Sequence, residues 1–227
     1  MKTSQFFGRK QGKALTKSRQ EALDALLPKL KIQIEENDLL NLSDLFSDTD
    51  NQTWLEIGFG SGEHCTGLLD QHPNVNLIAV EPFVNGMAAF LKDLQQKPEH
   101  HDRCRVFMDD ALLLVGALPD QSIDRLYILN PDPWHKKRHH KRRIVRPETL
   151  NEYARILKPG TDLIMSTDVP YLAEWMVTHT FNHPAFEWMA ASANDWREKP
   201  KDWIDTRYQT KGAKGADQMV YLMFKRV

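Results

Sequence analysis

The 227-residue chain has only two cysteines, and it has no long apolar run. Cys65 and Cys104 form neither a disulfide framework nor a spaced set of metal ligands, so we expect a reducing compartment and no metal site. The longest apolar run, residues 111–118, is too short to cross a bilayer. The basic N-terminus has no apolar stretch like that of a signal peptide, although a transit peptide could look similar. These absences predict a cytoplasmic globular protein with no membrane association.

Net charge is also small, at −1, but the charges are unevenly distributed. The first 20 residues carry six Lys and Arg residues and no acid, and residues 136–143 carry six more. All 31 acids lie in the rest of the chain, which is therefore acidic. Either basic segment alone could be a solvated loop. Together, on an acidic body, they predict a polarised surface that binds a phosphate backbone.

Hydrophobic patterning divides the chain into alternating strands and helices. Strands are predicted at 53–58, 75–81, 104–108, 122–130 and 161–168, with two more that begin at 185 and 218. Helices are predicted after Gly62, at 84–96, at 111–118, from Pro147 and at 171–181, and Thr16 or Ser18 can cap an earlier helix. Repeated strand–helix units predict an α/β fold, with a parallel sheet and helices on both faces. Ligands bind such sheets at the C-terminal strand ends.

The first predicted strand runs into a glycine-rich turn, LEIGFGSGEH, at residues 55–64. Gly58, Gly60 and Gly62 allow a sharp turn and let a ligand lie against the backbone. Dinucleotide enzymes, methyltransferases and plain tight turns all use such a sequence. The acid inside it, Glu56, would repel a pyrophosphate but not a sulfonium or an amino-acid ammonium group.

Two more acids stand where the next two strands end. Glu81 follows Glu56 by 25 residues, at a place where an acid typically accepts hydrogen bonds from both ribose hydroxyls. Asp110 stands where an adenine amino group would lie, although a helix N-terminus favours an acid there in any case. Three acids at three successive strand ends favour S-adenosylmethionine over NAD as the cofactor.

The fourth strand ends in NPDPW, at residues 130–134, directly before the basic residues 136–143. Pro131 and Pro133 fix φ and hold Asp132 in one pose. Trp134 supplies an adjacent plane on which a base could stack, although a rigid turn with a buried Trp would have the same sequence. The combination indicates a site that holds a polyanion while an acidic side chain acts on it.

The apolar strand positions predict the core of the sheet. We expect ten buried side chains: Leu55, Ile57, Leu77, Ile78, Val80, Val106, Leu126, Ile128, Leu163 and Ile164. The three acids Glu56, Glu81 and Asp132 should then meet along the C-terminal edge of that sheet.

These motifs, in their order and spacing, resemble those of bacterial tRNA (guanine-N(7)-)-methyltransferases. The resemblance rests on LEIGFGSGEH, AVEPF, MDDAL, NPDPWHKKRHHKRRIV, TDVPYLAEWM and DTRYQTKG. The N-terminal FFGRKQGKALTKSRQEALDALLPKL is also similar to that family, so the resemblance covers nearly the whole chain. It implies the Rossmann-like class I S-adenosylmethionine-dependent methyltransferase fold, with a seven-stranded, mostly parallel sheet. Residues 1–35 would be a basic extension and helix, and residues 36–227 the methyltransferase domain.

The resemblance also implies roles for individual residues, with Asp132 as the catalytic acid. The cofactor would lie against Glu56, Gly58, Gly60, Glu81, Asp110 and Asp132. The substrate would contact Lys136, Asp168, Thr206, Arg207, Tyr208 and Gln209. RNA would lie on Arg138, His139, His140, Lys141, Arg142 and Arg143. The product would be 7-methylguanosine in the tRNA variable loop, and no obligate protein partner is inferred.

Three positions depart from the family pattern. Asn130 stands where Phe is usual, and residues 206–209 read TRYQ where Thr-Lys-Phe-Glu is typical. The following TKGAKGADQ is unusually rich in Lys and Gly. Gln209 removes a carboxylate, so any contact that it makes with the substrate must be a neutral hydrogen bond.

The expected reaction needs no general base, because the ring nitrogen at position seven is already a nucleophile with no proton to lose. Alignment should supply most of the acceleration, and Asp132 should offset the positive charge on the methylated base. Two alternatives are a methyltransferase of the same fold that acts on another RNA or on a protein, and a non-catalytic RNA-binding module. The acids argue against the second alternative, since binding a phosphate backbone requires no carboxylate.

Overall fold

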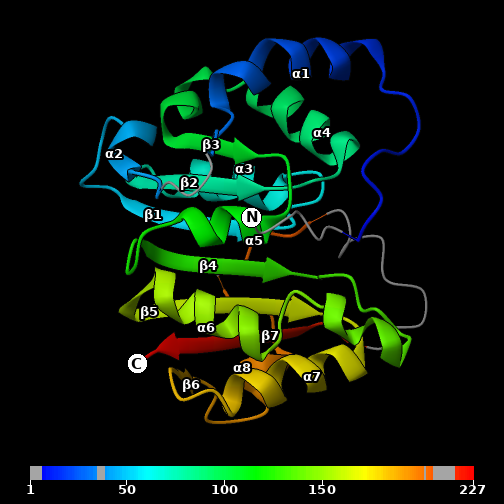
Figure 1. The fold of residues 1–227 in the computed structure, drawn as a ribbon, viewed down its shortest axis with the longest axis vertical. Helices are drawn as coiled ribbons and strands as arrows, with labels where there is room; N and C mark the ends of the chain where they lie inside the picture. The colour runs from blue at the N-terminus through cyan, green and yellow to red at the C-terminus, as the bar shows by residue number, and fades with distance from the viewer. Residues whose placement is uncertain (1–6, 35–38, 202, 207–217) are drawn as a thin grey trace.

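The computed structural model describes residues 7–34, 39–201, 203–206 and 218–227. These residues form a seven-stranded sheet in the order β3-β2-β1-β4-β5-β7-β6 (Figure 1). The strands are β1 (Gln52–Ile57), β2 (Val75–Val80), β3 (Cys104–Phe107), β4 (Ile123–Leu129), β5 (Leu157–Thr167), β6 (Phe186–Trp188) and β7 (Val220–Arg226). The pairs among β1 to β5 are parallel, whereas β7 runs antiparallel to both β5 and β6. The predicted seven-stranded, mostly parallel α/β fold is confirmed.

The helices follow the predicted order and include short ones that the sequence did not predict. They are α1 (Lys17–Leu30), α2 (Leu42–Leu45), α3 (Glu63–Gln71), α4 (Val84–Leu94), α5 (Ala111–Ala117), α6 (Pro147–Ile156), α7 (Pro170–Phe181) and α8 (Asn194–Arg197), with 3-10 helices η1 (Pro98–Arg103) and η2 (Lys137–Arg142). The elements α2, α8, η1 and η2 are too short to show a helical period in the sequence. Thr16 is the N-cap residue of α1, but its side chain makes no capping hydrogen bond.

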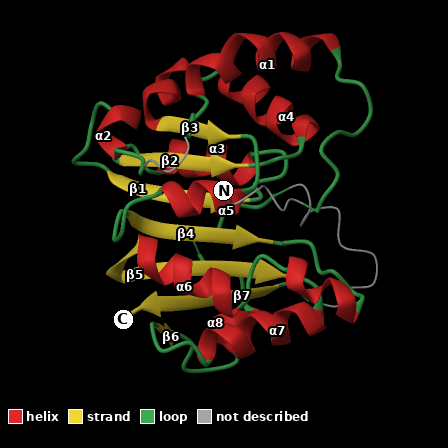
Figure 2. Ribbon diagram, in the orientation of Figure 1, coloured by secondary structure: helices red, strands yellow, loops and turns green. Residues whose placement is uncertain are grey.

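Helices cover both faces of the sheet (Figure 2). Side chains of α5, α6 and α7 share one core cluster, and those of α1, α3 and α4 share the other. Strand side chains alternate between the faces, so Leu55 and Ile57 of β1 join the first cluster and Trp54 joins the second. All ten side chains predicted for the core are buried. In the described part of the chain, no helix has both the length and the apolar character needed to span a membrane.

The strand order reverses between β1 and β4, which lie side by side in the middle of the sheet. The chain leaves β1 toward α3 on one face and leaves β4 toward α6 on the other face. At such a reversal the two connections diverge and leave a crevice at the C-terminal edge of the sheet. The glycine-rich turn and the NPDPW corner both lie at this edge.

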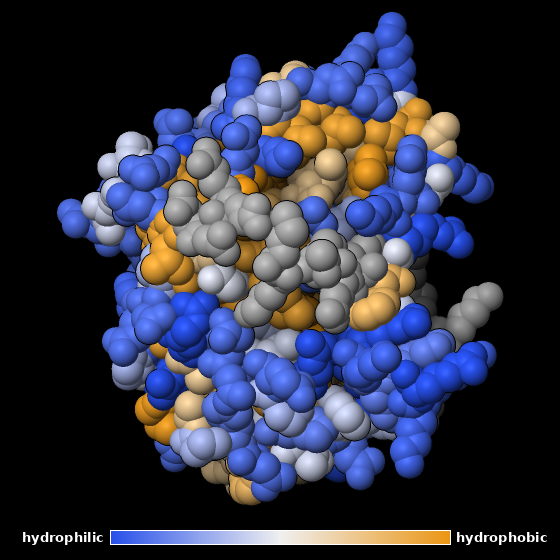
Figure 3. All heavy atoms as spheres, viewed as in Figure 1, coloured by the Kyte–Doolittle hydropathy of each residue, from blue (hydrophilic) through white to orange (hydrophobic). Residues whose placement is uncertain are grey.

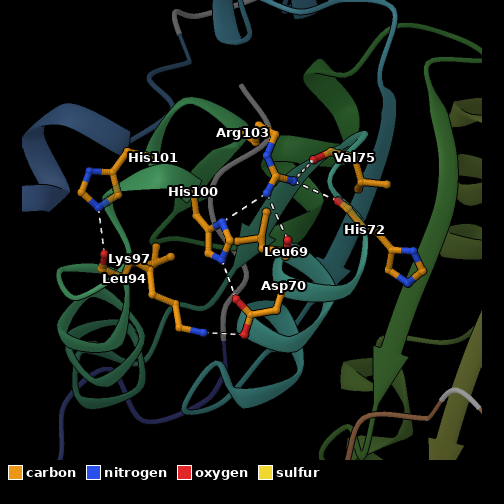
Figure 4. A network of polar contacts seen from close by, with 9 residues as sticks. All are labelled: Leu69, Asp70, His72, Val75, Leu94, Lys97, His100, His101 and Arg103. Carbon is orange, nitrogen blue, oxygen red and sulfur yellow. Dashed lines mark hydrogen bonds and ion pairs between the residues drawn. The ribbon is translucent and has the colours of Figure 1, made fainter.

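A polar network fastens η1 to the end of α3, away from that edge (Figure 4). We call it the Asp70 network, and it consists of Asp70, Lys97, His100 and Arg103. Lys97 pairs with the Asp70 carboxylate, and His100 Nε2 lies 2.6 Å from Asp70 Oδ1. Arg103 donates to His100 Nδ1 at 3.1 Å, so Nδ1 accepts and Nε2 carries the hydrogen that points to Asp70. The Arg103 guanidinium also donates to the carbonyl oxygens of Leu69, His72 and Val75.

Candidate active site

The turn after β1 and the corner after β4 line one cavity of about 480 Å³. Its walls are Phe7, Gly8, Arg9, Ile57, Gly58, Val80, Glu81, Pro82, Phe83, Asp110, Ala111, Leu112, Asn130, Pro131, Asp132, Trp134, Arg142, Ile144 and Arg146. Four residues predicted to contact the cofactor, Gly58, Glu81, Asp110 and Asp132, are therefore brought together. The cavity combines apolar walls with a few carboxylates, as a pocket for a small organic ligand does.

The glycine-rich turn depends on backbone conformations and spacings that other residues would disturb. Gly58, Gly60 and Gly62 have φ angles of 76°, 63° and 88°. These angles lie in the left-handed region, which glycine adopts without steric cost. The N-terminal turn of α4 presses on this segment, because a Cβ atom at Gly86 would lie 2.2 Å from the Gly60 carbonyl oxygen. The close approach of α4 thus fixes the turn at Gly60, whereas a Cβ at Gly58 would meet nothing within 4 Å.

Glu81 holds the same turn by hydrogen bonds. Its Oε2 accepts from the Gly60 amide at 2.7 Å, and its Oε1 accepts from the Phe83 amide at 3.0 Å. The pKa of Glu81 is raised from 4.5 to about 7, mainly by burial and also by the negative charges of Asp132 and Glu56, although the two backbone hydrogen bonds lower it. That electrostatic effect supports the prediction that the three acids meet at this edge of the sheet.

Asp110 caps α5 and also lines the cavity. Its carboxylate accepts a hydrogen bond from the Leu112 amide at 3.0 Å, and the side chain is buried. The structural role that an acid plays at a helix N-terminus is therefore present. It does not exclude the predicted contact with a ligand, because a carboxylate has further lone pairs that can accept hydrogen bonds.

Glu56 is a predicted cofactor residue that does not line the cavity. It is buried, and its Oε2 lies 2.8 Å from His64 Nδ1 and 3.0 Å from Cys65 Sγ. Burial and the neighbouring Glu56 raise the pKa of the Cys65 thiol well above its usual value, so Cys65 stays protonated and donates. In this structure Glu56 ties β1 to the first turn of α3, and its contact with a cofactor stays a prediction.

The NPDPW corner is held in an unusual backbone conformation. Asn130 and Trp134, at its two ends, have φ angles of 48° and 46°. Asn tolerates this region, whereas a bulky aromatic residue adopts it only when its surroundings impose it. Between them Asp132 is exposed on the cavity wall. The corner therefore presents one carboxylate from a backbone that has little freedom to move.

Arg143 supports this corner from inside the protein, so the prediction that it lies on RNA is wrong for this structure. The residue is only 2% exposed, and its Nε donates to the Pro133 carbonyl oxygen at 3.0 Å. Its guanidinium lies over the Trp175 ring of α7, 4.5 Å from the ring centroid. To contact a phosphate backbone, this side chain would have to leave its contacts with Pro133 and Trp175.

Arg142, the preceding residue, joins the corner to the N-terminal segment. Its guanidinium lies 5.1 Å from the centroid of the Trp134 ring and 4.7 Å from that of the Phe7 ring. Cations attract aromatic faces in this arrangement. One face of Trp134, which was predicted to receive a base, is thus occupied by Arg142. The prediction that Arg142 contacts RNA is not excluded, since the residue is partly exposed.

Residues 7–9 reach the cavity, which the sequence did not predict. The chain before α1 runs down past the end of α4 (Figure 1), and Lys10 accepts there from the Val84 amide at 2.9 Å. Asn85 accepts from the Gly12 amide at 2.7 Å and donates to the Lys13 carbonyl at 2.8 Å. From its basic composition, this segment was predicted only to bind a phosphate backbone. No pattern in the sequence indicated its packing against α4.

The other basic residues after the corner lie at the surface. Lys136, Arg138 and Lys141 are exposed, and hydrophilic side chains gather at the right side of Figure 3, where η2 lies. In the described part of the chain, no side chain of residues 136–143 forms an ion pair with a carboxylate. Slight desolvation, and then repulsion by surrounding cations including Arg142, lowers the pKa of His139. The positive charge is therefore not neutralised within these residues.

The predicted substrate residues are less completely described. Asp168 follows β5, is buried, and lines a second cavity of about 760 Å³ beside α7 and α8. Lys136 is exposed, and Thr206 belongs to the lining of neither cavity. Arg207, Tyr208 and Gln209 lie outside the described residues. Of the predicted substrate residues that the structure describes, Lys136, Asp168 and Thr206, none lines the cavity with Asp132.

Comparison with known structures defines the fold class of this protein, and comparison with known sequences defines its family. The solved structure of the 16S rRNA methyltransferase KamB matches 86% of this chain and 96% of its own, with a TM-score of 0.57 and 14% identity. Together with the cavity at the strand-order reversal, this likeness defines a Rossmann-like class I methyltransferase fold. A family model described as "Putative methyltransferase" matches residues 50–222.

Two curated relatives are similar over nearly the full length. The tRNA (guanine-N(7)-)-methyltransferase of Rhodospirillum rubrum is 38% identical over 98% of this chain and 88% of its own. The one of Agrobacterium fabrum is 40% identical over 99% of this chain and 96% of its own. The chain belongs to the tRNA (guanine-N(7)-)-methyltransferase family.

Proposed function

We propose that this protein transfers a methyl group from S-adenosylmethionine to N7 of a guanine in tRNA, and that the guanine lies in the variable loop. The near full-length similarity to enzymes with that activity supports the reaction and the substrate. The observation that carries the proposal is Asp132, an exposed carboxylate on the wall of the first cavity with uncompensated cations beside it. A bacterial tRNA-modifying enzyme of this kind would work in the cytoplasm.

The first cavity has the donors and acceptors that S-adenosylmethionine requires. The open backbone at Gly58 would lie against the ligand, and Glu81 would accept hydrogen bonds from ribose hydroxyls. Asp110 would accept from the adenine amino group at the start of α5. Residues 7–9 and Ile144 form other walls of the same cavity.

When bound, S-adenosylmethionine would supply a sulfonium methyl group to the N7 lone pair. The electron pair of the broken carbon–sulfur bond would stay on sulfur, and the positive charge would pass to the base. No proton is transferred, so Asp132 does not act as a base. Its carboxylate lies on the cavity wall, where it offsets charge on the base or orients its hydrogen-bond donors. Because the corner is rigid, this stabilisation requires little reorganisation during the reaction.

The surface cations hold tRNA by its phosphates. Lys136, Arg138 and Lys141 are exposed close to the corner in the chain, and phosphate contacts give affinity and orientation without reading sequence. Selection of one guanine must then come from tRNA shape and from the fit of the base beside Asp132.

The experiment that tests the proposal is methylation of an unmodified tRNA transcript with S-adenosylmethionine labelled in the methyl group. We expect 7-methylguanosine at a single variable-loop position. A matched transcript with 7-deazaguanosine at that position should accept no label, since its ring has carbon in place of N7. Label in a different nucleoside, or in the deaza transcript, would contradict the proposed reaction.

A further inference from the structure

Residues 199–201 and 203–205 belong to a small closed loop just before Thr206, the first residue of the segment predicted to contact the substrate. Lys199 Nζ pairs with Asp205 Oδ2 at 2.9 Å, which joins the two ends of the loop. The Trp203 amide donates to the Pro200 carbonyl at 3.0 Å, which tightens the loop from inside. Thr206 follows directly, so the position of the loop determines where the chain toward the substrate begins.

The loop is attached to the face of the sheet that carries α3. Trp196 of α8 packs on the first core cluster, whereas Trp203 and Ile204 pack on the second. The chain therefore crosses from one face to the other between these residues. The Trp203 and Tyr221 rings pack in a T-shaped arrangement with their centroids 4.7 Å apart. The centroid of the Trp203 ring lies 5.8 Å from that of the His64 ring.

Ile204 fits against a glycine in the middle of α3. A Cβ atom at Gly67 would lie 2.7 Å from Ile204 Cγ2, 3.0 Å from Cδ1 and 3.1 Å from Cγ1. Its three nearest neighbours would thus be the three outer atoms of one side chain. Glycine inside a helix costs about 1 kcal/mol relative to alanine, so its presence here needs a reason. The close approach of Ile204 supplies one, and we call this contact the Gly67 socket.

The same part of α3 is tied to the cofactor side of the sheet. His64, which precedes Gly67 by one helical turn, is buried and lies 2.8 Å from the Glu56 carboxylate of β1. Its ring also meets the Tyr127 ring of β4 at 4.8 Å. Trp203 therefore packs against a side chain that β1 and β4 hold in place, under the turn that lines the first cavity.

We propose that the Gly67 socket positions the substrate-binding segment: Gly67 and Ile204 are positioning residues that set Thr206 relative to the cofactor cavity. The inference rests on the proposed function, in which Thr206 contacts the substrate. Neither residue touches the reacting atoms. Their effect should be on the rate at which bound tRNA is methylated, because reactions of this kind depend on alignment.

The test compares two substitutions of helical glycines. Gly67→Ala should force Ile204 away, and the methylation rate at saturating tRNA should fall about tenfold or more, as small misplacements can cause. Gly116→Ala in α5 is the matched control, because a Cβ atom there would meet nothing within 4 Å. Both changes replace a helical glycine by alanine, so the gain in helix propensity favours folding in both variants and cannot account for a loss in one of them. Affinity for S-adenosylhomocysteine, measured by calorimetry, should be unchanged in both.

A compensating substitution distinguishes positioning from general damage. Ile204→Ala removes all three atoms that a Cβ at Gly67 would meet, so the double variant should recover part of the rate lost in Gly67→Ala. Amide hydrogen exchange of residues 203–206 should be faster in Gly67→Ala and unchanged in Gly116→Ala. A wild-type rate in Gly67→Ala would overturn the inference, as would a parallel loss of S-adenosylhomocysteine binding or a double variant without recovery. If the wild-type protein methylates no tRNA, the proposed function fails, and the exchange experiment still decides whether the socket holds the loop.

Discussion

Two groups of basic side chains in this protein have opposite surroundings. In the Asp70 network, Lys97 and His100 bond to one carboxylate, and Arg103 donates to three main-chain carbonyls (Figure 4). Among residues 136–143, no side chain forms an ion pair with a carboxylate of the described residues. Cations that build the fold are held by carboxylates or by main-chain carbonyls within it. Cations that lack such partners remain available to a polyanion.

Arg143 belongs to the first kind although the sequence places it in the second. It donates to Pro133 and lies over Trp175, so it supports the corner as Arg103 supports the turn between α3 and β2. Basic residues within 136–143 thus have different roles, and the burial of each side chain decides which role it has. The predictions below test that division, from the largest expected effect to the smallest.

The largest effect should come from Asp132, which precedes the exposed cations in the chain and lines the first cavity. Asp132→Asn keeps the shape of the corner, so affinity for tRNA should be nearly unchanged. The methylation rate at saturating tRNA should fall by about two orders of magnitude, because a preorganised charge is lost. Single-turnover kinetics measures both quantities. A near-normal rate would show that Asp132 only shapes the corner.

Arg143 should behave as part of the fold. Arg143→Met keeps most of the volume but leaves the partly buried Pro133 carbonyl without its donor, which should cost about 1–3 kcal/mol of unfolding free energy. Arg138→Met, at an exposed position in the same run, should leave stability unchanged. Chemical denaturation of both variants gives the comparison. Equal stabilities would mean that the burial of Arg143 does not support the corner.

Most of the fold was predictable from the sequence because burial on both sheet faces leaves continuous apolar strands, such as VNLIAV in β2. Glu81, Asp110 and Asp132 were placed correctly, since parallel strands end at one edge. Arg143 was misassigned because nothing in a basic run shows which member points inward. The contact of Phe7 with Arg142 depends on packing between distant segments, which no local pattern encodes.

The raised pKa of Glu81 predicts how cofactor binding depends on pH. Below its pKa of about 7 the carboxyl is mostly protonated in the empty cavity, whereas ribose hydroxyls that donate to it favour the charged form. Affinity for S-adenosylhomocysteine should therefore weaken as pH falls below 7, by up to about tenfold per pH unit. Calorimetry in buffers between about pH 5.5 and about pH 8.5, on both sides of that pKa, measures this dependence. Glu81→Gln should bind weakly with no such dependence.

The exposed cations should affect tRNA binding without affecting the reaction. Replacing Lys136, Arg138 and Lys141 singly by Ala should each raise KM for tRNA. Each lost phosphate contact should flatten the slope of log affinity against log salt by about 0.7–0.9. The methylation rate at saturating tRNA should be unchanged in Arg138→Ala and Lys141→Ala, because a phosphate contact is equally strong in the ground state and in the transition state. A saturated rate that falls with either change would place that cation next to the reacting base.

The smallest effect should come from the Asp70 network. Hydrogen bonds from Lys97 and His100 lower the pKa of Asp70 although burial alone would raise it, so its stabilising effect is present above pH 3.8 and is lost as pH falls through the lowered pKa. The Asp70 side chain is 43% exposed, so Asp70→Asn should cost about 1 kcal/mol or less near neutral pH. The stabilities of the two proteins should converge in acid. Methylation should be unchanged, because the network lies away from the C-terminal strand ends. A lower saturated rate in Asp70→Asn would connect this network to the active site, and the division between cations that build the fold and cations that meet the ligand would then be wrong.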